Sequence, residues 1–532
     1  MRLRRLAIAL AALAAVILST ARPGAFPAAR AQELKLAIGA AVTSLDPHFH
    51  NAAQNTSVFS HFFDRLVNRT AEAGVAPGLA VSWQAVADTV WEFRLRPGVH
   101  WHDGAPFTAD DVAFTLARVP HVPNSPASYA SYLSAVRRVE VVDPMTVRLH
   151  TAMPAPNQPI DLALVGIVSR KHGEAATTAD YNSGKAMVGT GPYRFARYLP
   201  GDRVDMTRND AWWGPRQAWE RVELRFIANA GARTAALLSG AVDMIDTPPA
   251  ADLPRIKADP RLAVSTRQGM RVIFLRPDFS RAGGTPYVTD AAGGKLAQNP
   301  MLDVRVRRAL SLAINRAALA ERVQENAAVP TGQWLPPGAF GHNPDVKVPA
   351  PDPEGARKLL AEAGFPQGFR LTLHTPNDRF PNDAATAQAV AQMFSRVGVA
   401  TQVEAMPFSA LAARMARQDF SLVLFGWGST SGEAGSVLLN VVSTYDRATG
   451  RGASNTARYS NPALDALIGR ALATMDDGAR EKLFHQAVAM AMEDVSFIPL
   501  YNQINSWAFK KTIHYPARSD ERTFAFEVTP AQ

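Results

Sequence analysis

One segment of the chain has the spacing of a nucleophilic turn. Gly428-Ser429-Thr430-Ser431-Gly432 follows an apolar run that reads as a strand, which is the context of the G-x-S-x-G turn of hydrolases. Threonine stands where that turn needs its serine nucleophile, and no Asp/His pair is spaced to complete a catalytic triad. We therefore expect no enzyme, and a hydrolase acting through Thr430 stays as the alternative from another functional class.

Two further segments have residue types that serve metals or nucleotides. His100 and His102 alternate along a predicted strand, so both side chains would leave one face, as two metal ligands can. The run GTG at 189–191 begins a dinucleotide-binding pattern, but Arg194 takes the place of its third glycine and a strand follows where a helix is needed. We expect a hairpin turn at the glycines, and neither a metal site nor a cofactor.

The nucleophile-like turn lies at the end of an alternating series of elements. From residue 369 the chain reads as strand FRLTLHTP, helix DAATAQAVAQMFSRVGV, strand VATQVEAMP, helix FSALAARMARQ and strand FSLVLFGWG. This order implies crossover connections and parallel pairing. Ligands of such sheets usually bind beyond the carboxyl ends of the strands. The loop GWGSTSGEAG, which starts at Gly426, leaves that edge and is a candidate ligand loop.

The other segments also predict mixed α/β structure. A first strand is predicted over 34–40 and a helix over 51–68, where apolar side chains repeat at helical spacing. Hairpin turns are predicted at 143–144 and at 200–202, and a helix begins after the N-cap Asp303.

The beginning of the chain has the pattern of an export signal. Three arginines within the first five residues precede an apolar run over 6–18, and small residues follow up to Ala31. Thirteen apolar residues are fewer than the about 20 that a membrane-spanning helix needs. We predict a signal peptide over 1–31 and an exported, soluble protein that does not span the membrane.

The composition is that of a globular protein and excludes several classes. The chain has 532 residues, of which 47% are hydrophobic, enough for roughly two to four domains. Its formal net charge is +9, but the predicted signal peptide holds five arginines and no acid, which leaves 51 basic and 47 acidic residues. Without a long basic run, nucleic-acid binding is not expected. Cysteine is absent, so disulfides, thiolate metal sites and lipid attachment through cysteine are impossible.

Six segments in order resemble the peptide- and nickel-type solute-binding proteins of ABC importers, family 5 of the extracellular solute-binding proteins. They lie between about residues 34 and 526 and read SLDPH, WEFRLRPGVHWHDGAPFTADDVAFTLARV, VGTGPYRF, NPMLDVRVRRALSLAINR, DPEGARKLLAEAG and IPLYNQ. The resemblance implies a periplasmic, non-catalytic monomer. It would capture a peptide-like solute, such as a di- or oligopeptide or glutathione, for the permease and ATPase of an importer. A carrier of nickel, a metal chelate or another non-peptide solute stays as the alternative.

The resemblance also implies the α/β type II periplasmic-binding-protein fold, with two lobes, a hinge and an extra β-rich domain. Lobe I would comprise 32–74, 187–270 and 496–532, the accessory β-rich domain 75–186, and lobe II 271–495. A ligand held between the lobes favours the closed form, because only then does it contact both lobes.

By the same resemblance, ligand-binding residues lie in three segments and at one separate arginine. The loop after the first strand would contribute Asn51 and Asn55, and a crossing strand Gln268 and Arg271. Arg379 falls where dipeptide binders place an arginine for the peptide carboxylate, which a guanidinium can hold through two hydrogen bonds.

The candidate ligand loop would contribute Gly426, Trp427, Ser429, Thr430 and Glu433, with Trp427 as an apolar wall. In the family's peptide binders an aspartate three residues after the tryptophan pairs with the peptide ammonium. Thr430 occupies that position here, and Glu433 is the nearest acid. The loop is more similar to the glutathione-binding branch, which shares an S-T-G-[ED]-A-like run. The plainer alternatives are surface charges at Arg379 and Glu433 and a core position for Trp427.

Overall fold

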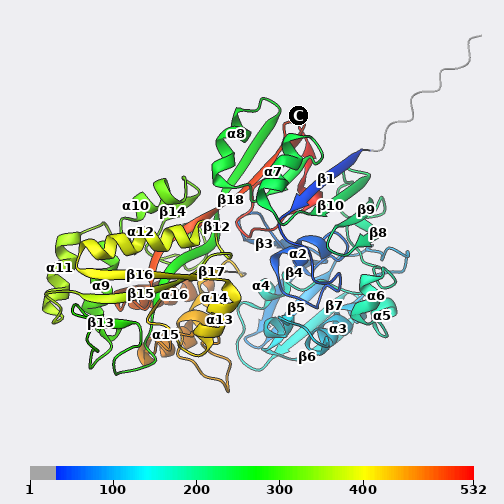
Figure 1. The fold of residues 1–532 in the computed structure, drawn as a ribbon. Coiled ribbons are helices and arrows are strands. Elements are labelled where there is room, and N and C mark those ends of the chain that lie inside the picture. The colour runs from blue at the N-terminus through cyan, green and yellow to red at the C-terminus, as the bar shows by residue number, and fades with distance from the viewer. Residues whose placement is uncertain (1–31, 430, 532) are drawn as a thin grey trace, which may run out of the picture.

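The computed structural model describes residues 32–429 and 431–531. The chain forms two lobes of mixed α/β structure and a smaller β-rich part beside the first lobe (Figure 1). One sheet of twelve strands runs through both lobes, and a separate sheet of four strands lies in the β-rich part. The predicted signal peptide lies outside the described residues.

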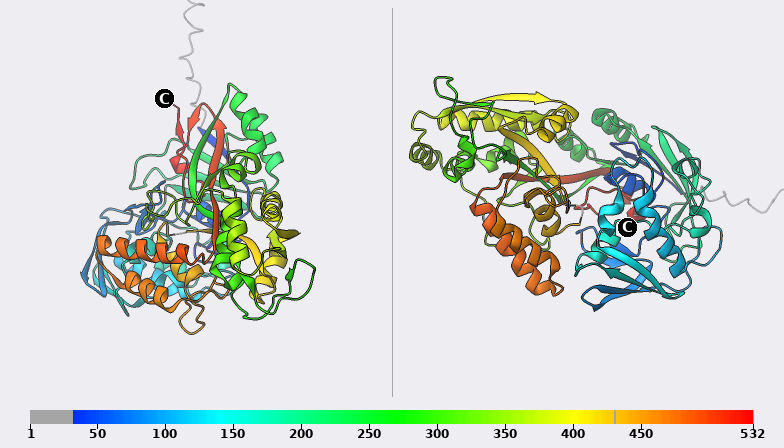
Figure 2. Two further views of the ribbon diagram at one scale, coloured as in Figure 1. Left: turned by 90° about the vertical axis from the view of Figure 1, so that its left-hand side faces the viewer. Right: turned by 90° about the horizontal axis from the view of Figure 1, so that it is seen from below.

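Two long antiparallel strands, β12 (Leu262–Pro277) and β18 (Ile498–Lys510), connect the lobes (Figures 1 and 2). The order of the large sheet is β13-β15-β17-β12-β18-β11-β1-β10-β9-β8, with β14 on β18 and β16 on β15. The strands of the first lobe are β1 (Glu33–Ile38), β8 (Tyr193–Leu199), β9 (Arg203–Arg208), β10 (Arg221–Phe226) and β11 (Met244–Asp246). Those of the second are β13 (Val288–Asp290), β14 (Ala328–Pro330), β15 (Phe369–Pro376), β16 (Val399–Met406) and β17 (Leu422–Gly428).

The pairing of β12 with β18 is interrupted where the chain passes between the lobes. Gln268 pairs with Ile504, but the next paired residue is Val272, which pairs with Asn502. Gly269 lies in this irregular stretch, and a Cβ there would be 2.7 Å from the Asn505 side-chain oxygen. Such an irregularity bends a strand and re-aims its side chains. It therefore sets the direction of Arg271.

The β-rich part is a four-stranded antiparallel sheet covered by helices. Its strands, in the order β4-β5-β7-β6, are β4 (Ala80–Ala87), β5 (Val90–Leu95), β7 (Thr146–Thr151) and β6 (Val136–Asp143). Helix α3 (Ala109–Arg118) starts with a capping box between Thr108 and Asp111. The shorter helices are α4 (Gln158–Leu162), α5 (Arg170–Gly173) and α6 (Thr178–Asn182).

Most helices lie where the apolar periodicity predicts them. Asp303 caps α9 by accepting a hydrogen bond from the Arg305 N–H, as predicted. The first lobe holds α2 (Ala53–Phe59), α7 (Ala230–Leu238) and α8 (Leu253–Ala258). The second holds α9 (Val304–Ala313), α10 (Arg316–Ala318), α11 (Pro353–Glu362), α12 (Asp383–Arg396), α13 (Phe408–Ala416), α14 (Ala434–Val437), α15 (Pro462–Ala473) and α16 (Asp477–Glu493).

The predicted helix over 51–68 is wrong in its extent, because α2 ends at Phe59. The carbonyls beyond it accept hydrogen bonds from distant amides instead of from the next helical turn. The Phe62 carbonyl accepts from Gly191, and the Arg65 carbonyl from Leu79. Val67–Arg69 then forms strand β2, which pairs with β3 (Val75–Pro77). The apolar side chains of this stretch are buried, Val58 in α2 and Phe62 and Leu66 in the irregular chain that follows it.

The glycines at 189–191 make a close backbone contact, as expected of a turn and not of a nucleotide loop. A Cβ on Gly189 would lie 1.8 Å from the Phe62 carbonyl oxygen, so only glycine fits. Strands β8 and β9 follow as a hairpin around 200–202. In the part of the chain that the structure describes, no helix is long and apolar enough to cross a membrane.

Candidate functional site

The predicted ligand loop lies at the carboxyl edge of the second lobe's parallel strands. β15 pairs in parallel with β16 and with β17, as predicted, and the loop starts where β17 ends at Gly428. The Ser429 N–H donates to the Met270 carbonyl, and the Met270 N–H donates to the Ser519 carbonyl. The loop, the crossing strand β12 and the C-terminal segment therefore meet at one place. Thr430 lies outside the described residues.

A pair of guanidinium groups dominates the charge at this edge. Arg271 donates two hydrogen bonds to the Glu521 carboxylate, at 2.8 and 2.9 Å. Burial alone would raise the pKa of Glu521, but the charge and hydrogen bonds of Arg271, together with the charge of Arg379, lower this pKa below its usual value. Arg271 is thus neutralised by a carboxylate of the chain itself.

Arg379, in contrast, forms no ion pair among the described residues, although the carboxylates of Glu521 and Asp378 lie near enough to oppose the lowering of its pKa by burial. Its guanidinium lies 5.4 Å from the ring centre of Phe380 and 5.5 Å from that of Phe408. The side chain is exposed, and it forms neither a hydrogen bond nor an ion pair with any other residue that the structure describes. Two aromatic faces hold the cation in place while its donors stay available. A guanidinium in this position can bind a carboxylate.

Close packing explains the two glycines of the strand that ends in the loop. A Cβ on Gly426 would lie 2.6 Å from the Ile273 side chain and 2.8 Å from the Phe380 ring. A Cβ on Gly428 would lie 3.1 Å from the Arg271 guanidinium. Trp427 between them is half-buried against the second lobe's core, and its buried indole N–H finds no acceptor among the described residues. Both readings of Trp427, apolar wall and core residue, fit this position.

The polar side chains of the loop are engaged inside the protein. The Ser429 hydroxyl donates to the Glu433 carbonyl at 3.1 Å and accepts from the Gly432 N–H at 3.1 Å. Glu433 is buried, and its Oε1 accepts from the Asn157 amide at 2.9 Å. Burial raises the pKa of Glu433, and the charge of Arg480 opposes that rise. Ser429 and Glu433 therefore shape the loop. Among the described residues, only the second carboxylate oxygen of Glu433 has no hydrogen-bond partner in this pair.

Asn157 links the β-rich part to the second lobe. Its amide nitrogen donates to Glu433, and its amide oxygen accepts from Arg480 Nη1 at 2.9 Å. Since both partners are charged, these hydrogen bonds are of the stronger kind and fix the orientation of the amide. Both bonds form only when the lobes are together, so they stabilise the contact between them.

We predict that Asn157→Leu shifts the ligand-free protein toward an open form. The change removes both hydrogen bonds and should disfavour lobe contact by at least about 1.5 kcal/mol, the low end for a hydrogen bond to a charged group. Small-angle X-ray scattering should then give a larger radius of gyration than wild type. Gln84→Leu, on the exposed strand β4, is the matched control and should leave the radius unchanged. An unchanged radius in Asn157→Leu would show that these bonds do not hold the lobes together.

The remaining predicted residues make contacts within the protein. The Asn51 amide donates to the Tyr132 hydroxyl at 2.7 Å. The Asn55 amide donates to the Thr43 hydroxyl at 3.1 Å and to the Ser44 carbonyl at 3.0 Å, and the residue is buried. The Gln268 amide donates to the Asn502 side chain at 3.3 Å. Gln268 therefore lies beside Arg271 at the crossing, whereas Asn51 and Asn55 order the first lobe.

Sequence reasoning missed Glu521, Phe408 and Asn157 as parts of this region. Glu521 and Asn157 lie in segments without apolar periodicity or a recognisable motif, so no local signal marks them. Phe408 follows Pro407 at the start of α13, where only the parallel-strand topology could have placed it.

The histidine pair of the sequence does not offer two free ring nitrogens. His102 is buried, with Nδ1 accepting from the Gly189 N–H at 3.2 Å and Nε2 donating to the Gly191 carbonyl at 3.1 Å. Burial lowers the pKa of His102 to about 4. The described residues contain no cluster of three or more His, Asp or Glu side chains suited to a metal ion.

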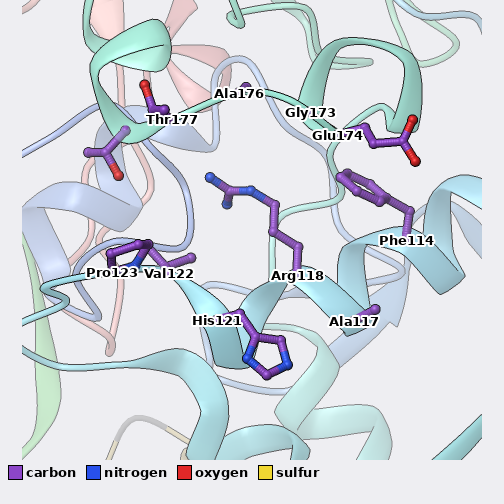
Figure 3. A pocket seen from close by; sticks show the side chains of 11 residues that line it. Phe114, Ala117, Arg118, His121, Val122, Pro123, Gly173, Glu174, Ala176 and Thr177 are labelled. Carbon is purple, nitrogen blue, oxygen red and sulfur yellow. The ribbon is translucent and has the colours of Figure 1, made fainter.

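A surface cavity of about 320 Å³ lies on the β-rich part, away from these residues. It is lined by α3 and by the segment 173–178, and the Arg118 side chain reaches into it (Figure 3). The Arg118 guanidinium is already paired with Asp46 at 2.7 Å. The cavity shares no residue with the ligand loop or with Arg379, so it is not the predicted site.

Comparison with known proteins identifies the family. A profile described as bacterial extracellular solute-binding proteins, family 5 (middle region) matches residues 74–449. The chain is 26% identical over 470 residues to Heme-binding protein A of Haemophilus influenzae, covering 83% of this chain and 82% of that protein. It is 27% identical to the Dipeptide-binding protein of Escherichia coli, covering 80% of each chain. It is also 27% identical to the Glutathione-binding protein GsiB of Pectobacterium atrosepticum, covering 96% of this chain and 94% of that one.

Comparison with solved structures gives the same fold. The structure of HbpA2 from Haemophilus parasuis superposes with a TM-score of 0.81 at 24% identity, covering 94% of this chain and 100% of that chain. This confirms the predicted two-lobed, type II α/β architecture. The profile match extends over more than half of the chain and agrees with the fold. The chain belongs to family 5 of the bacterial extracellular solute-binding proteins.

Proposed function

We propose that the protein captures a small peptide-like solute with a carboxylate between its lobes and delivers it to the permease and ATPase of an ABC importer. The observation that carries the proposal is the unpaired Arg379 guanidinium, held between two phenyl rings at the carboxyl edge of the parallel strands. A guanidinium binds a carboxylate through two parallel hydrogen bonds. Relatives named for binding dipeptides and glutathione, both of which carry carboxylates, agree with this ligand class.

The charges at the edge favour an anion over a metal cation. Arg271 and Arg379 carry two positive charges, and Glu521 neutralises one of them. Arg379 therefore keeps a guanidinium without an ion pair among the described residues, and this cation attracts a carboxylate and repels Ni²⁺. A bare nickel ion thus fits poorly, whereas a chelate that presents a carboxylate remains a second candidate for the same group.

The remaining features of the proposal come from the sequence. The protein is exported to the periplasm through the signal peptide 1–31, binds its solute as a monomer and catalyses no reaction. Its domains are lobe I (32–74, 187–270 and 496–532), the accessory β-rich domain (75–186) and lobe II (271–495). Limited proteolysis of the folded protein, with mass spectrometry of the fragments, tests these boundaries.

A ligand screen on residues 32–532 tests the function. The protein is unfolded and refolded to remove bound solute, then melted with Ala-Phe, tri-alanine, glutathione, nickel and a nickel–histidine chelate. A ligand at about 100 times its dissociation constant adds about 2.7 kcal/mol of stability, enough to raise the melting midpoint measurably. We expect a shift with at least one carboxylate-bearing peptide and none with its C-terminal amide.

Two results would contradict the proposal. A shift with nickel alone would favour the metal-carrier alternative. Chromatography of the same mixtures tests the hydrolase alternative, because a hydrolase would release free amino acids from the peptides, in a reaction lost in Thr430→Ala. Intact peptides after prolonged incubation would agree with capture without turnover.

A further inference from the structure

A second arginine beside the ligand loop lacks an anionic partner. Arg69, the last residue of β2, is only 9% exposed. Its side chain forms no hydrogen bond and no ion pair within the described chain, and Nε and Nη2 are buried without any acceptor. Burial, together with the charges of Arg522 and Arg518, lowers the pKa of Arg69 to about 10 against the opposing charges of Asp520 and Glu433, so the group stays charged at neutral pH. A buried, charged guanidinium without hydrogen bonds is strongly unfavourable.

Three acids lie near Arg69, namely Asp520, Glu433 and Asp161, and none of them forms an ion pair with it in the described chain. Asp520 accepts from Arg518 at 2.9 Å and from Arg522 at 3.0 Å. Glu433 accepts from the Asn157 amide through Oε1, and neither of its oxygens lies within ion-pair distance of Arg69. Arg69 is therefore a buried guanidinium near three carboxyls, but its buried Nε and Nη2 have no acceptor among the described residues.

The position of Arg69 relates it to the ligand loop. A Cβ on Gly432 would lie 2.3 Å from Arg69 Nη2, just as a Cβ on Gly428 would lie 3.1 Å from the Arg271 guanidinium. The loop between the two glycines thus has one guanidinium at each end, of which only Arg271 is paired. Arg69 is on the first lobe and Gly432 is on the second. Because the two residues lie on different lobes, we expect separation of the lobes to uncover Arg69, so that a solute can reach it before the lobes close.

We propose that Arg69 forms a second anion subsite, and that the solute is a peptide-like diacid with one carboxylate for Arg379 and one for Arg69. The inference rests on the proposed function and narrows its ligand class. An ordinary dipeptide has one carboxylate on its main chain, whereas glutathione and peptides with an acidic side chain have two. Arg69 therefore sets the specificity, because it remains buried and unpaired when a monoacid is bound.

Calorimetry with matched ligands tests the subsite. Wild type and Arg69→Gln are titrated with glutathione, with its glycine monoethyl ester, and with tri-alanine. For wild type we expect glutathione to bind at least about 10-fold more tightly than either single-carboxylate ligand. In Arg69→Gln that preference should disappear, while the affinity for tri-alanine changes by less than about 3-fold. Arg137→Gln, which removes an exposed arginine of the β-rich part, should behave as wild type.

Stability of the ligand-free protein separates a binding role from a structural one. If Arg69 serves a ligand, its removal relieves an unpaired buried charge, and the melting midpoint of Arg69→Gln should equal or exceed that of wild type. A lower midpoint, or a preference for glutathione that survives in Arg69→Gln, would overturn the subsite. Equal loss of glutathione and tri-alanine binding would also overturn it, because it would remove the distinction between one carboxylate and two.

An anion series keeps the inference testable if no peptide binds. Sulfate, phosphate and succinate are titrated against wild type, Arg69→Gln and Arg379→Gln, with melting as the readout. Stabilisation by succinate that requires both arginines would support a diacid site even if the peptide proposal failed. Stabilisation by sulfate or phosphate alone would assign an inorganic anion to Arg69 and overturn the diacid. Equal stabilisation of all three proteins would show that Arg69 binds no anion.

Discussion

Replacing Arg379 with alanine should weaken the binding of Ala-Phe by about 100-fold, or about 3 kcal/mol. The guanidinium forms no ion pair among the described residues, and its aromatic neighbours hold it in place before a ligand arrives. The peptide carboxylate would otherwise enter the site without a charged donor, and it would lose the two hydrogen bonds that a guanidinium offers. Isothermal titration calorimetry of wild type and Arg379→Ala with Ala-Phe measures the difference.

The C-terminal amide of the same peptide supplies the control ligand. Wild type should bind the amide about as weakly as Arg379→Ala binds the acid, and Arg379→Ala should no longer distinguish acid from amide. Arg137→Ala, at an exposed position of the β-rich part, should retain wild-type affinity for both. If Arg379→Ala binds the acid as tightly as wild type does, Arg379 is a surface charge and the carboxylate is held elsewhere.

Local patterns predicted the elements that position the site. The alternating strand and helix patterns from 369 to 428 predicted parallel pairing, and β15 is parallel to both β16 and β17. That topology alone places the loop after Gly428 at a ligand-binding edge. It also brings Arg379, which follows β15, to the same edge. The predictions of these strands and helices succeed because each element depends mainly on residues that are close together in the sequence.

Local patterns failed where distant segments decide the structure. The apolar spacing over 51–68 is that of a helix, yet carbonyls beyond Phe59 bond to amides from 79 and 191, more than ten residues away. Glu433 looked like an accessible acid beside a ligand, but Asn157 reaches it from 276 residues earlier in the chain. The spacing of residues in the sequence cannot predict contacts between such distant segments. The sequence likewise cannot show that Arg69 lacks hydrogen-bond acceptors, because the residues around it come from distant parts of the chain.

Three buried histidines give the fold a dependence on pH that no sequence pattern shows. Burial lowers the pKa values of His48, His61 and His102 to about 4 each. In each neutral ring, one nitrogen accepts a hydrogen bond from an N–H group and the other donates to a backbone carbonyl. At His61, Nδ1 lies 3.1 Å from the Val58 carbonyl, and Nε2 accepts from the Ala525 N–H at 2.8 Å. His61 thereby ties α2 to the C-terminal segment that carries Glu521.

The expected result is that the stability which His61 contributes is lost as the pH falls from about 6.5 to about 4. An unfolded histidine takes up a proton near pH 6.5, whereas folded His61 does not do so until about pH 4. The unfolded state therefore binds more protons throughout this window, and folding becomes less favourable as the pH falls, by about 1.4 kcal/mol per pH unit for one group.

Urea unfolding of wild type and His61→Gln at pH 7 and at pH 4.5 measures this contribution. The stability advantage of wild type should shrink by about 2–3 kcal/mol between the two pH values. Buried carboxyls with raised pKa values, such as Glu433 and Asp161, act in the opposite direction, but both proteins contain them and their effect cancels in the difference. His514→Gln, at an exposed position, should show no such change. A difference that stays constant with pH would mean that His61 accepts a proton in the folded protein as readily as in the unfolded chain, and an NMR titration of its ring would then give a pKa near 6.5.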